Sequence, residues 1–219
     1  VRTAGQAMWQ RRACSVLVVD DQDRLVGIFT GRDAVRLLGN TAAAAAAPLS
    51  QAMTPNPVTS PPQGRAADAL RAMIQGGFRH VPVTQDGKIL GVVSRADFKG
   101  MEFEEYRWNN VSQTPSEANR TLSAIIEQQQ PLILSVDHKV AEACRLMSER
   151  KTGSALVADK RQRLKGIFTG RDAVRVLAKA KDAAGARLAM AMTSDPATMA
   201  PQNHAIDALR LMNDCGFRH

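Results

Sequence analysis

Hydrophobic and polar positions alternate in short blocks along the first part of the chain. The runs Ser15–Asp20 and Arg24–Thr30 are rich in β-branched residues and flank an Asp-rich turn. This pattern predicts a β-hairpin. The run His80–Ser94 repeats the design around Asp86 and Gly87, a dipeptide that favours a tight hairpin turn.

Helical periodicity surrounds these hairpins. In Ala67–Gly77 the apolar residues recur at helical spacing, and a glycine pair ends the segment. A helix is also expected at Ala34–Leu38, directly after the first hairpin, and a short extended piece at Asn56–Ser60. The order helix, strand, strand, helix therefore predicts small α/β units.

The chain is a tandem duplication. The decapeptide GIFTGRDAVR occurs at Gly27–Arg36 and again, letter for letter, at Gly166–Arg175, an offset of 139 residues. The same offset aligns Val1–His80 with Val140–His219 without a gap. About half of the aligned pairs are identical, which indicates a repeat architecture.

Each half divides again, so we expect four repeats. Their predicted bounds are residues 1–47, 48–100, 122–188 and 189–219, with a linker at 101–121. The first repeat starts at its helix and the fourth stops before its hairpin, so both are expected to be incomplete. The linker is polar and turn-rich, and a functional lid is the alternative interpretation of it.

Composition narrows the classes of partner and site. The formal charge of +8 is spread along the chain without a dense basic run, so a solvated surface is favoured over a nucleic-acid interface. Three cysteines far apart match no metal-ligand spacing and suggest a reducing, cytoplasmic setting. No apolar run reaches membrane-spanning length.

The end of the repeated decapeptide carries candidate chemistry. Thr30 and Asp33 have the S/T-x-x-D spacing of a helix-capping box, which recurs at Ser94 with Asp97 and at Thr169 with Asp172. One interpretation is that the motif only starts a helix. The other is that the motif forms part of a nucleotide site.

A helix start presents free amides and a positive dipole to a phosphate, and a hydroxyl at the cap adds a hydrogen bond. Arg32, Arg95 and Arg171 would add positive charge. A carboxylate one turn into the helix can accept both hydroxyls of a ribose. Hydroxyl, cation and carboxylate together thus favour a nucleotide.

Catalysis is not indicated. The chain has no GxxxxGK loop, no GxGxxG after a strand, and no Ser-His-Asp or Cys-His arrangement. His80 begins a predicted strand, where it either packs or contacts a ligand. Histidines and cysteines never cluster, so neither a metal nor a catalytic cofactor is expected.

Residues 52–98, AMTPNPVTSPPQGRAADALRAMIQGGFRHVPVTQDGKILGVVSRADF, resemble a CBS domain. The resemblance rests on the M-T-x-x-P-V opening, the G-x-R-H-h-P-V strand and the G-h-h-S/T-x-x-D close, where h is hydrophobic. Leu132–Ala178 carries a second full-length version with a looser opening, and the first and fourth repeats match in part. The resemblance implies an α/β fold of β-α-β-β-α units, paired by pseudo-twofold symmetry into two Bateman modules.

The same resemblance implies a non-enzymatic regulatory role. Such modules bind AMP, ADP, ATP or S-adenosylmethionine in clefts between paired repeats and signal to a regulated protein, and a homodimer is expected. The acids would hold the ribose, the hydroxyls would face the phosphate, and the opening strand and the strand after the first helix would flank the adenine. A structural pairing module without ligand is the alternative. The candidate ligand-binding residues are Thr30, Arg32, Asp33, Val58, Thr59, His80, Val81, Pro82, Ser94, Arg95, Asp97, Leu134, Ser154, Thr169, Arg171 and Asp172.

Overall fold

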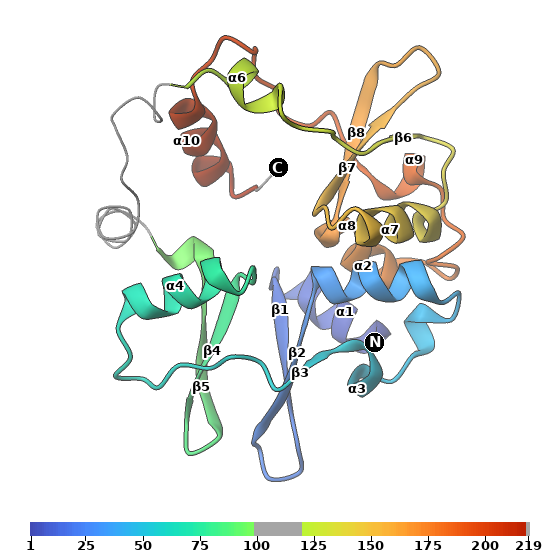
Figure 1. Cartoon of the computed structure of the whole chain (residues 1–219). Coiled ribbons are helices and arrows are strands. Elements are labelled where there is room, and N and C mark those ends of the chain that lie inside the picture. Colours follow the sequence, from blue (N-terminus) through green and yellow to red (C-terminus); the bar gives the residue numbers. More distant parts are fainter. Residues whose placement is uncertain (99–119, 218–219) are drawn as a thin grey trace. The chain divides into compact units, whose positions relative to one another are not determined.

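The structure, a computed structural model, describes residues 1–98 and 120–217 of the chain (Figure 1). Nearly all of the linker predicted at 101–121 lies outside these residues. The α-helices are α1 (Arg2–Gln10), α2 (Gly31–Asn40), α3 (Leu49–Ala52), α4 (Ala66–Gln75), α6 (Leu122–Ile126), α7 (Val140–Glu149), α8 (Gly170–Lys179), α9 (Leu188–Ala191) and α10 (Ala205–Cys215). The strands are β1 (Ser15–Val19), β2 (Leu25–Thr30), β3 (Thr54–Pro55), β4 (His80–Gln85), β5 (Lys88–Ser94), β6 (Ile133–Ser135), β7 (Ser154–Ala158), β8 (Leu164–Thr169) and β9 (Thr193–Ser194).

The predicted hairpins and helices are confirmed. The β4–β5 hairpin turns through Asp86 and Gly87, whose φ angles of 52° and 78° are those of a primed turn. The piece predicted to be extended at Asn56–Ser60 belongs to no named strand, and Asn56 within it has a left-handed φ of 45°. Within it only Ser60 forms a β-bridge, with Val83, whereas the short strand β3 lies just before it.

The described chain forms two compact units. The first comprises residues 1–19, 26–56 and 131–197. It holds the sheet β1-β2-β3 and the sheet β6-β7-β8-β9, in which β6 runs parallel to β7 and the other pairs are antiparallel. Residues 48–56, which open the predicted second repeat, belong to this unit, and their helix α3 packs on α2 of the first repeat.

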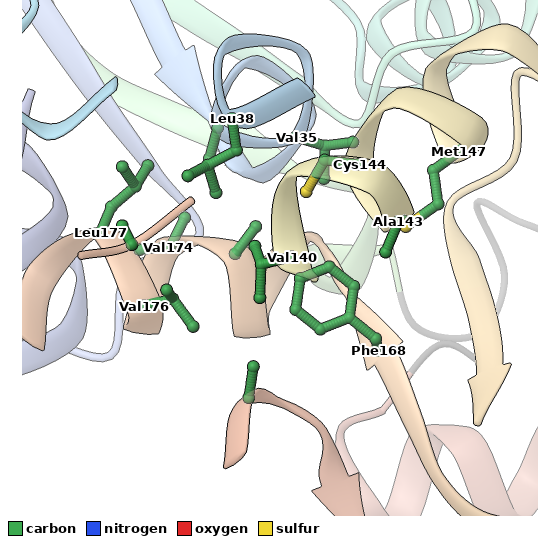
Figure 2. Packing of buried hydrophobic residues seen from close by; sticks show 14 of the residues in the cluster. Val35, Leu38, Val140, Ala143, Cys144, Met147, Phe168, Val174, Val176 and Leu177 are labelled. Atoms are coloured by element: carbon green, nitrogen blue, oxygen red, sulfur yellow. The ribbon is translucent and has the colours of Figure 1, made fainter. Parts of the chain in front are cut away.

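Helices from the first and third repeats build the core of this unit. Helix α1 packs on α8, and α2 packs on both α7 and α8. Most of the side chains in this core are aliphatic, and the aromatic ring of Phe168 lies among them (Figure 2). Leu38 of α2 and Leu177 of α8 occupy equivalent repeat positions, and both are fully buried.

These helix contacts follow a pseudo-twofold relation. A Cβ placed on Gly5 of α1 would lie 3.5 Å from the backbone of Ala178 in α8. One placed on Gly39 of α2 would lie 3.0 Å from the backbone of Cys144 in α7. Because Gly5 and Gly39 are the repeat equivalents of Cys144 and Ala178, the two helix pairs meet at corresponding positions. The duplicated sequence thus packs against itself.

The second unit comprises residues 20–25, 57–130 and 198–219, as far as they are described. Helix α4 covers the β4–β5 hairpin and buries Leu70, Met73 and Val81 completely. Helix α10 (Ala205–Cys215) also belongs to this unit. The backbone N–H of Leu122, at the start of α6, donates to the carbonyl oxygen of Asn203 at 2.8 Å, just before α10.

Thiol reactivity tests the packing of α7. Cys144 is fully buried in the core, and desolvation raises the pKa of its thiol to about 12. Because the thiolate is the reactive form, Cys144 should resist a thiol reagent at pH 8 until the protein unfolds. Cys215, which is exposed, should react at once. Peptide mapping by mass spectrometry after timed labelling measures both, and fast native labelling of Cys144 would contradict the packing.

Candidate functional site

The closing motif forms the predicted capping box at the end of β2. Thr30 is the N-cap of α2, and its hydroxyl accepts a hydrogen bond from the backbone N–H of Arg32 at 3.3 Å. The Asp33 Oδ2 accepts from both the backbone N–H and the hydroxyl of Thr30, at 2.9 and 2.8 Å. The capping box thus supplies hydrogen-bond partners to backbone N–H groups where β2 ends and α2 begins.

The second oxygen of Asp33 is used as well. Its Oδ1 accepts from Arg36 Nη2 at 3.1 Å and from Thr54 Oγ1 at 2.9 Å. Arg36 Nη2 also donates to the carbonyl oxygen of Ala52 at 2.7 Å. The carboxylate is 3% exposed and accepts four hydrogen bonds, which fill its usual acceptor capacity.

The third repeat builds the same arrangement. Asp172 is 3% exposed and accepts from the backbone and hydroxyl of Thr169, from Arg175 Nη2 at 2.8 Å and from Thr193 Oγ1 at 2.9 Å. Arg175 Nη2 also donates to the carbonyl oxygen of Ala191 at 2.6 Å. We call each set of Asp, Arg and Thr side chains a clasp: Asp33, Arg36 and Thr54, and Asp172, Arg175 and Thr193.

Each clasp joins the end of one repeat to the opening Ala-Met-Thr of the next. The methionine contributes too, because a Cβ on Gly27 would lie within 3 Å of the Met53 side chain, and one on Gly166 would meet Met192. The repeated decapeptide and the repeated Ala-Met-Thr thus contact each other in both halves. This explains structurally why both sequences occur twice.

The second repeat departs from this arrangement. Asp97 is exposed, and its Oδ2 accepts from the backbone N–H of Ser94 at 2.6 Å in a capping box that starts a single 3₁₀ turn. Three residues on, where Asp33 and Asp172 have an arginine, the sequence has Gly100. Asp97 therefore lacks the arginine partner of a clasp, and its carboxylate is accessible.

Asp97 lines a hollow of about 230 Å³ in the second unit. Val83 of β4 and Val93 of β5 form apolar walls, and Ala69 on α4 keeps the hollow open because its side chain is small. Ser60, which bridges to Val83, and Arg65, the N-cap of α4, add a hydroxyl and a cation to the lining of the same hollow. An acid, a cation, a hydroxyl and apolar walls therefore converge here.

None of the other residues predicted for the second repeat belongs to this lining. Val81 and Pro82 are buried in β4, and Val58 is exposed. His80 pairs with Ser94 across the hairpin, so the start of β4 lies beside the closing motif. Only Asp97 belongs to both the predicted set and the hollow. Thr59 and Arg95 likewise do not line it.

The predicted residues of the first and third repeats are brought together only at the strand ends. Ser154 pairs with Thr169 across β7 and β8, and Leu134 is buried beside Val157. Arg32 and Arg171 are exposed at the starts of α2 and α8.

Sequence reasoning missed Ser60, Arg65, Val83 and Val93 as lining residues. The alternation of β4 was a usable signal, since Val83 lies two residues after Val81 and faces the same side of the strand. Arg65 had no comparable signal, because its position depends on where α4 begins.

The described residues offer neither a metal site nor a membrane span. Within 1–98 and 120–217, no three His, Cys, Asp or Glu side chains gather in a way that could hold a metal ion. Over the same residues no helix is both long and apolar enough to cross a bilayer.

Comparison with known proteins identifies relatives. The profile of the family described as "CBS domain" matches residues 5–40, 49–100 and 123–179, more than half of the chain. The CBS domain-containing protein CBSCBSPB1 of Arabidopsis thaliana is 28% identical over 247 residues, covering 99% of this chain and 45% of the relative. The chain thus spans less than half the length of this relative.

A solved structure shares the fold. The crystal structure of protein MJ1225 from Methanocaldococcus jannaschii, described as an archaeal homologue of g-AMPK, superposes with a TM-score of 0.74 at 16% identity. The match covers 99% of this chain and 83% of that one. The α/β architecture of tandem repeats predicted above is therefore confirmed.

Proposed function

Because the chain belongs to the CBS domain family, we propose that it is a regulatory module whose second repeat binds an adenosine ligand, namely AMP, ADP, ATP or S-adenosylmethionine. The observation that carries this proposal is the contrast among the three motif acids. Asp33 and Asp172 are closed within clasps, whereas Asp97 is exposed at a hollow with a cation and apolar walls. The accessible acid marks the site.

Asp97 holds the ribose in this proposal. One carboxylate oxygen accepts from Ser94, and no described residue donates to the other. A carboxylate oxygen at the rim of a hollow can accept a ribose hydroxyl, as acids in dinucleotide sites do. Ser94, His80 and Arg95 lie next to it and would contact the sugar or the phosphate.

The hollow holds the base. Val83 and Val93 provide the apolar surface on which a planar ring packs. At about 230 Å³ the hollow is smaller than the roughly 300–1,000 Å³ of sites that enclose drug-sized ligands. It therefore fits one ring of the ligand, while the remainder extends outward past Arg65.

Occupancy would act by linkage. A ligand that binds one arrangement of the repeats better than another shifts the equilibrium toward that arrangement, and a partner protein responds to the difference. In this proposal the chain is non-enzymatic and forms a homodimer. The two clasps favour a structural role for Asp33 and Asp172, and binding of ribose there would require the exchange of a clasp hydrogen bond.

Calorimetric titration with AMP, ADP, ATP and S-adenosylmethionine tests the proposal. At least one ligand should bind the wild type, and Asp97→Ala should weaken it on the order of tenfold or more, because a hydrogen bond to a charged group is lost. Asp207→Ala is the matched control, since Asp207 is a partly exposed acid on α10 outside the hollow. Absence of binding by the wild type, or equal affinity in Asp97→Ala, would overturn the proposal.

A further inference from the structure

The turns of the β1–β2 and β7–β8 hairpins are repeat equivalents with the same backbone. In the first, the backbone N–H of Asp20 donates to the carbonyl oxygen of Arg24 at 2.9 Å. In the second, Asp159 donates to Arg163 at 3.0 Å. Their left-handed positions also match, with φ of 58° at Asp23 and 59° at the equivalent Gln162. The two turns therefore have the same backbone conformation.

The charges on this scaffold are opposite. Residues 21–23 read Asp-Gln-Asp, whereas the equivalent residues 160–162 read Lys-Arg-Gln. Lys165, whose Nζ lies 3.7 Å from Asp159 Oδ2, adds a further cation where the first turn has Val26. Half of the duplicated sequence is unchanged, but at this turn three consecutive positions differ and the sign of the charge inverts.

The charges shared by both turns are neutralised in place. The Asp20 and Arg24 side chains form an ion pair at 2.9 Å, and Asp159 and Arg163 form one at 2.8 Å. Hydrogen bonds from the backbone N–H groups of Arg24 and Arg163 lower the pKa of the two carboxyls, which stay ionised. These four residues hold the turns together and leave the differing residues to set their net charge.

The differing side chains are presented to solvent. Asp21 and Asp23 are exposed, as are Lys160 and Arg161, and none of the four side chains forms an ion pair with a residue in the described part of the chain. Beside each turn an aliphatic side chain is also exposed: Val19 at 42% and Leu164 at 41%. Each turn thus offers charge next to a small apolar surface.

We propose that the acidic turn, residues 20–24, docks on the basic turn, residues 159–165, of a second copy of this chain. The two surfaces are complementary in charge and are present in equal number. Because they differ, two copies can pair reciprocally through two such contacts, or add head to tail. Exposed ion pairs are individually weak and screened by salt, so the association is concentration-dependent and salt-sensitive.

A second copy explains more than a nucleic acid would. A phosphate backbone would use the basic turn alone and would be repelled by the acidic one. Only a partner that carries both signs uses both turns, and this chain is such a partner.

The test exchanges the two tripeptides. The all-basic variant carries Asp21→Lys, Gln22→Arg and Asp23→Gln, and the all-acidic variant carries Lys160→Asp, Arg161→Gln and Gln162→Asp. Each new tripeptide already occupies the same backbone elsewhere in the chain, so the turns should be retained. Sedimentation velocity over a concentration series, at about 20 mM and about 500 mM salt, measures association with little and with strong screening.

The wild type should associate at low salt, and each variant alone should associate on the order of tenfold more weakly, because like charges now meet. An equal mixture of the two variants, or one chain carrying both exchanges, should restore association. The mixture is decisive because two misfolded proteins would not rescue each other.

Three outcomes would overturn the proposal. In the first, the wild type shows no salt-sensitive association. In the second, that association does not depend on concentration, which would place the pairing within one chain. In the third, the exchanges leave self-association unchanged but alter binding of a short DNA duplex, which would assign the basic turn to nucleic acid. Because none of these outcomes involves an adenosine ligand, they are independent of the ligand titration.

Discussion

Asp172→Ala is expected to lower the free energy of unfolding by about 3 kcal/mol, because it breaks a largely buried ion pair. The Asp172 side chain is 4% exposed, and that of Arg175 is 28% exposed. Without the carboxylate the arginine loses its counter-ion, and Thr169 and Thr193 lose their acceptor. Urea denaturation followed by circular dichroism measures the change.

Asp97→Ala is the matched control for this prediction. Asp97 occupies the equivalent motif position but is exposed and lacks the arginine, so the loss should be no more than about 1 kcal/mol, the size of a capping interaction. The pair of variants thus separates two roles: Asp172→Ala should affect stability, and Asp97→Ala should affect ligand affinity. Equal losses of stability in the two variants would contradict the assignment of a clasp to Asp172 and not to Asp97.

Gly31→Ala is expected to destabilise the protein by about 2–3 kcal/mol, because it inserts a methyl group into a contact that has no room for it. A Cβ at Gly31 would lie 2.9 Å from the backbone carbonyl carbon and oxygen of Gly170, and a Cβ at Gly170 would meet Gly31 at 3.0 Å. The neighbour is backbone and cannot rotate away. Helices α2 and α8 would have to separate where they begin.

Gly91→Ala provides the control for the helix contact. Nothing lies within 4 Å of a Cβ placed on Gly91, and its φ is not in the left-handed region. Its effect should be within about 0.5 kcal/mol, as for a surface substitution. Thermal unfolding of both variants checks the difference, and a similar melting temperature for the two would show that α2 and α8 do not approach as described.

The local elements were predictable because their causes are local. The Asp86-Gly87 turn follows from which residues tolerate positive φ, and the capping boxes follow from a spacing of three residues. The extended piece expected at Asn56–Ser60 does not become a named strand, because its backbone pairs only at its ends: the N–H of Asn56 donates to the carbonyl oxygen of Val26, and Ser60 bridges to Val83.

The candidate site was predicted in part. The motif identified Asp33, Asp97 and Asp172 as equivalent acids, and the structure separates them. A signal existed in the sequence, since an arginine lies three residues after Asp33 and after Asp172, whereas Gly100 lies three residues after Asp97. The role of this arginine could not be inferred from the sequence, because Arg36 binds Asp33 together with Thr54, which is 21 residues away from Asp33.

The duplicated sequence was sufficient to establish the repeat, the hairpins, the helix starts and the family resemblance, because each depends on neighbouring residues or on direct comparison of letters. It could not show that helices of the first and third repeats share a core. Nor could it show that two motif acids are enclosed while one faces a hollow. Those features depend on contacts between distant segments, such as Gly31 with Gly170 and Asp172 with Thr193. Burial is a property of the packed chain, so motifs that share the S/T-x-x-D spacing differ in accessibility when their surroundings differ.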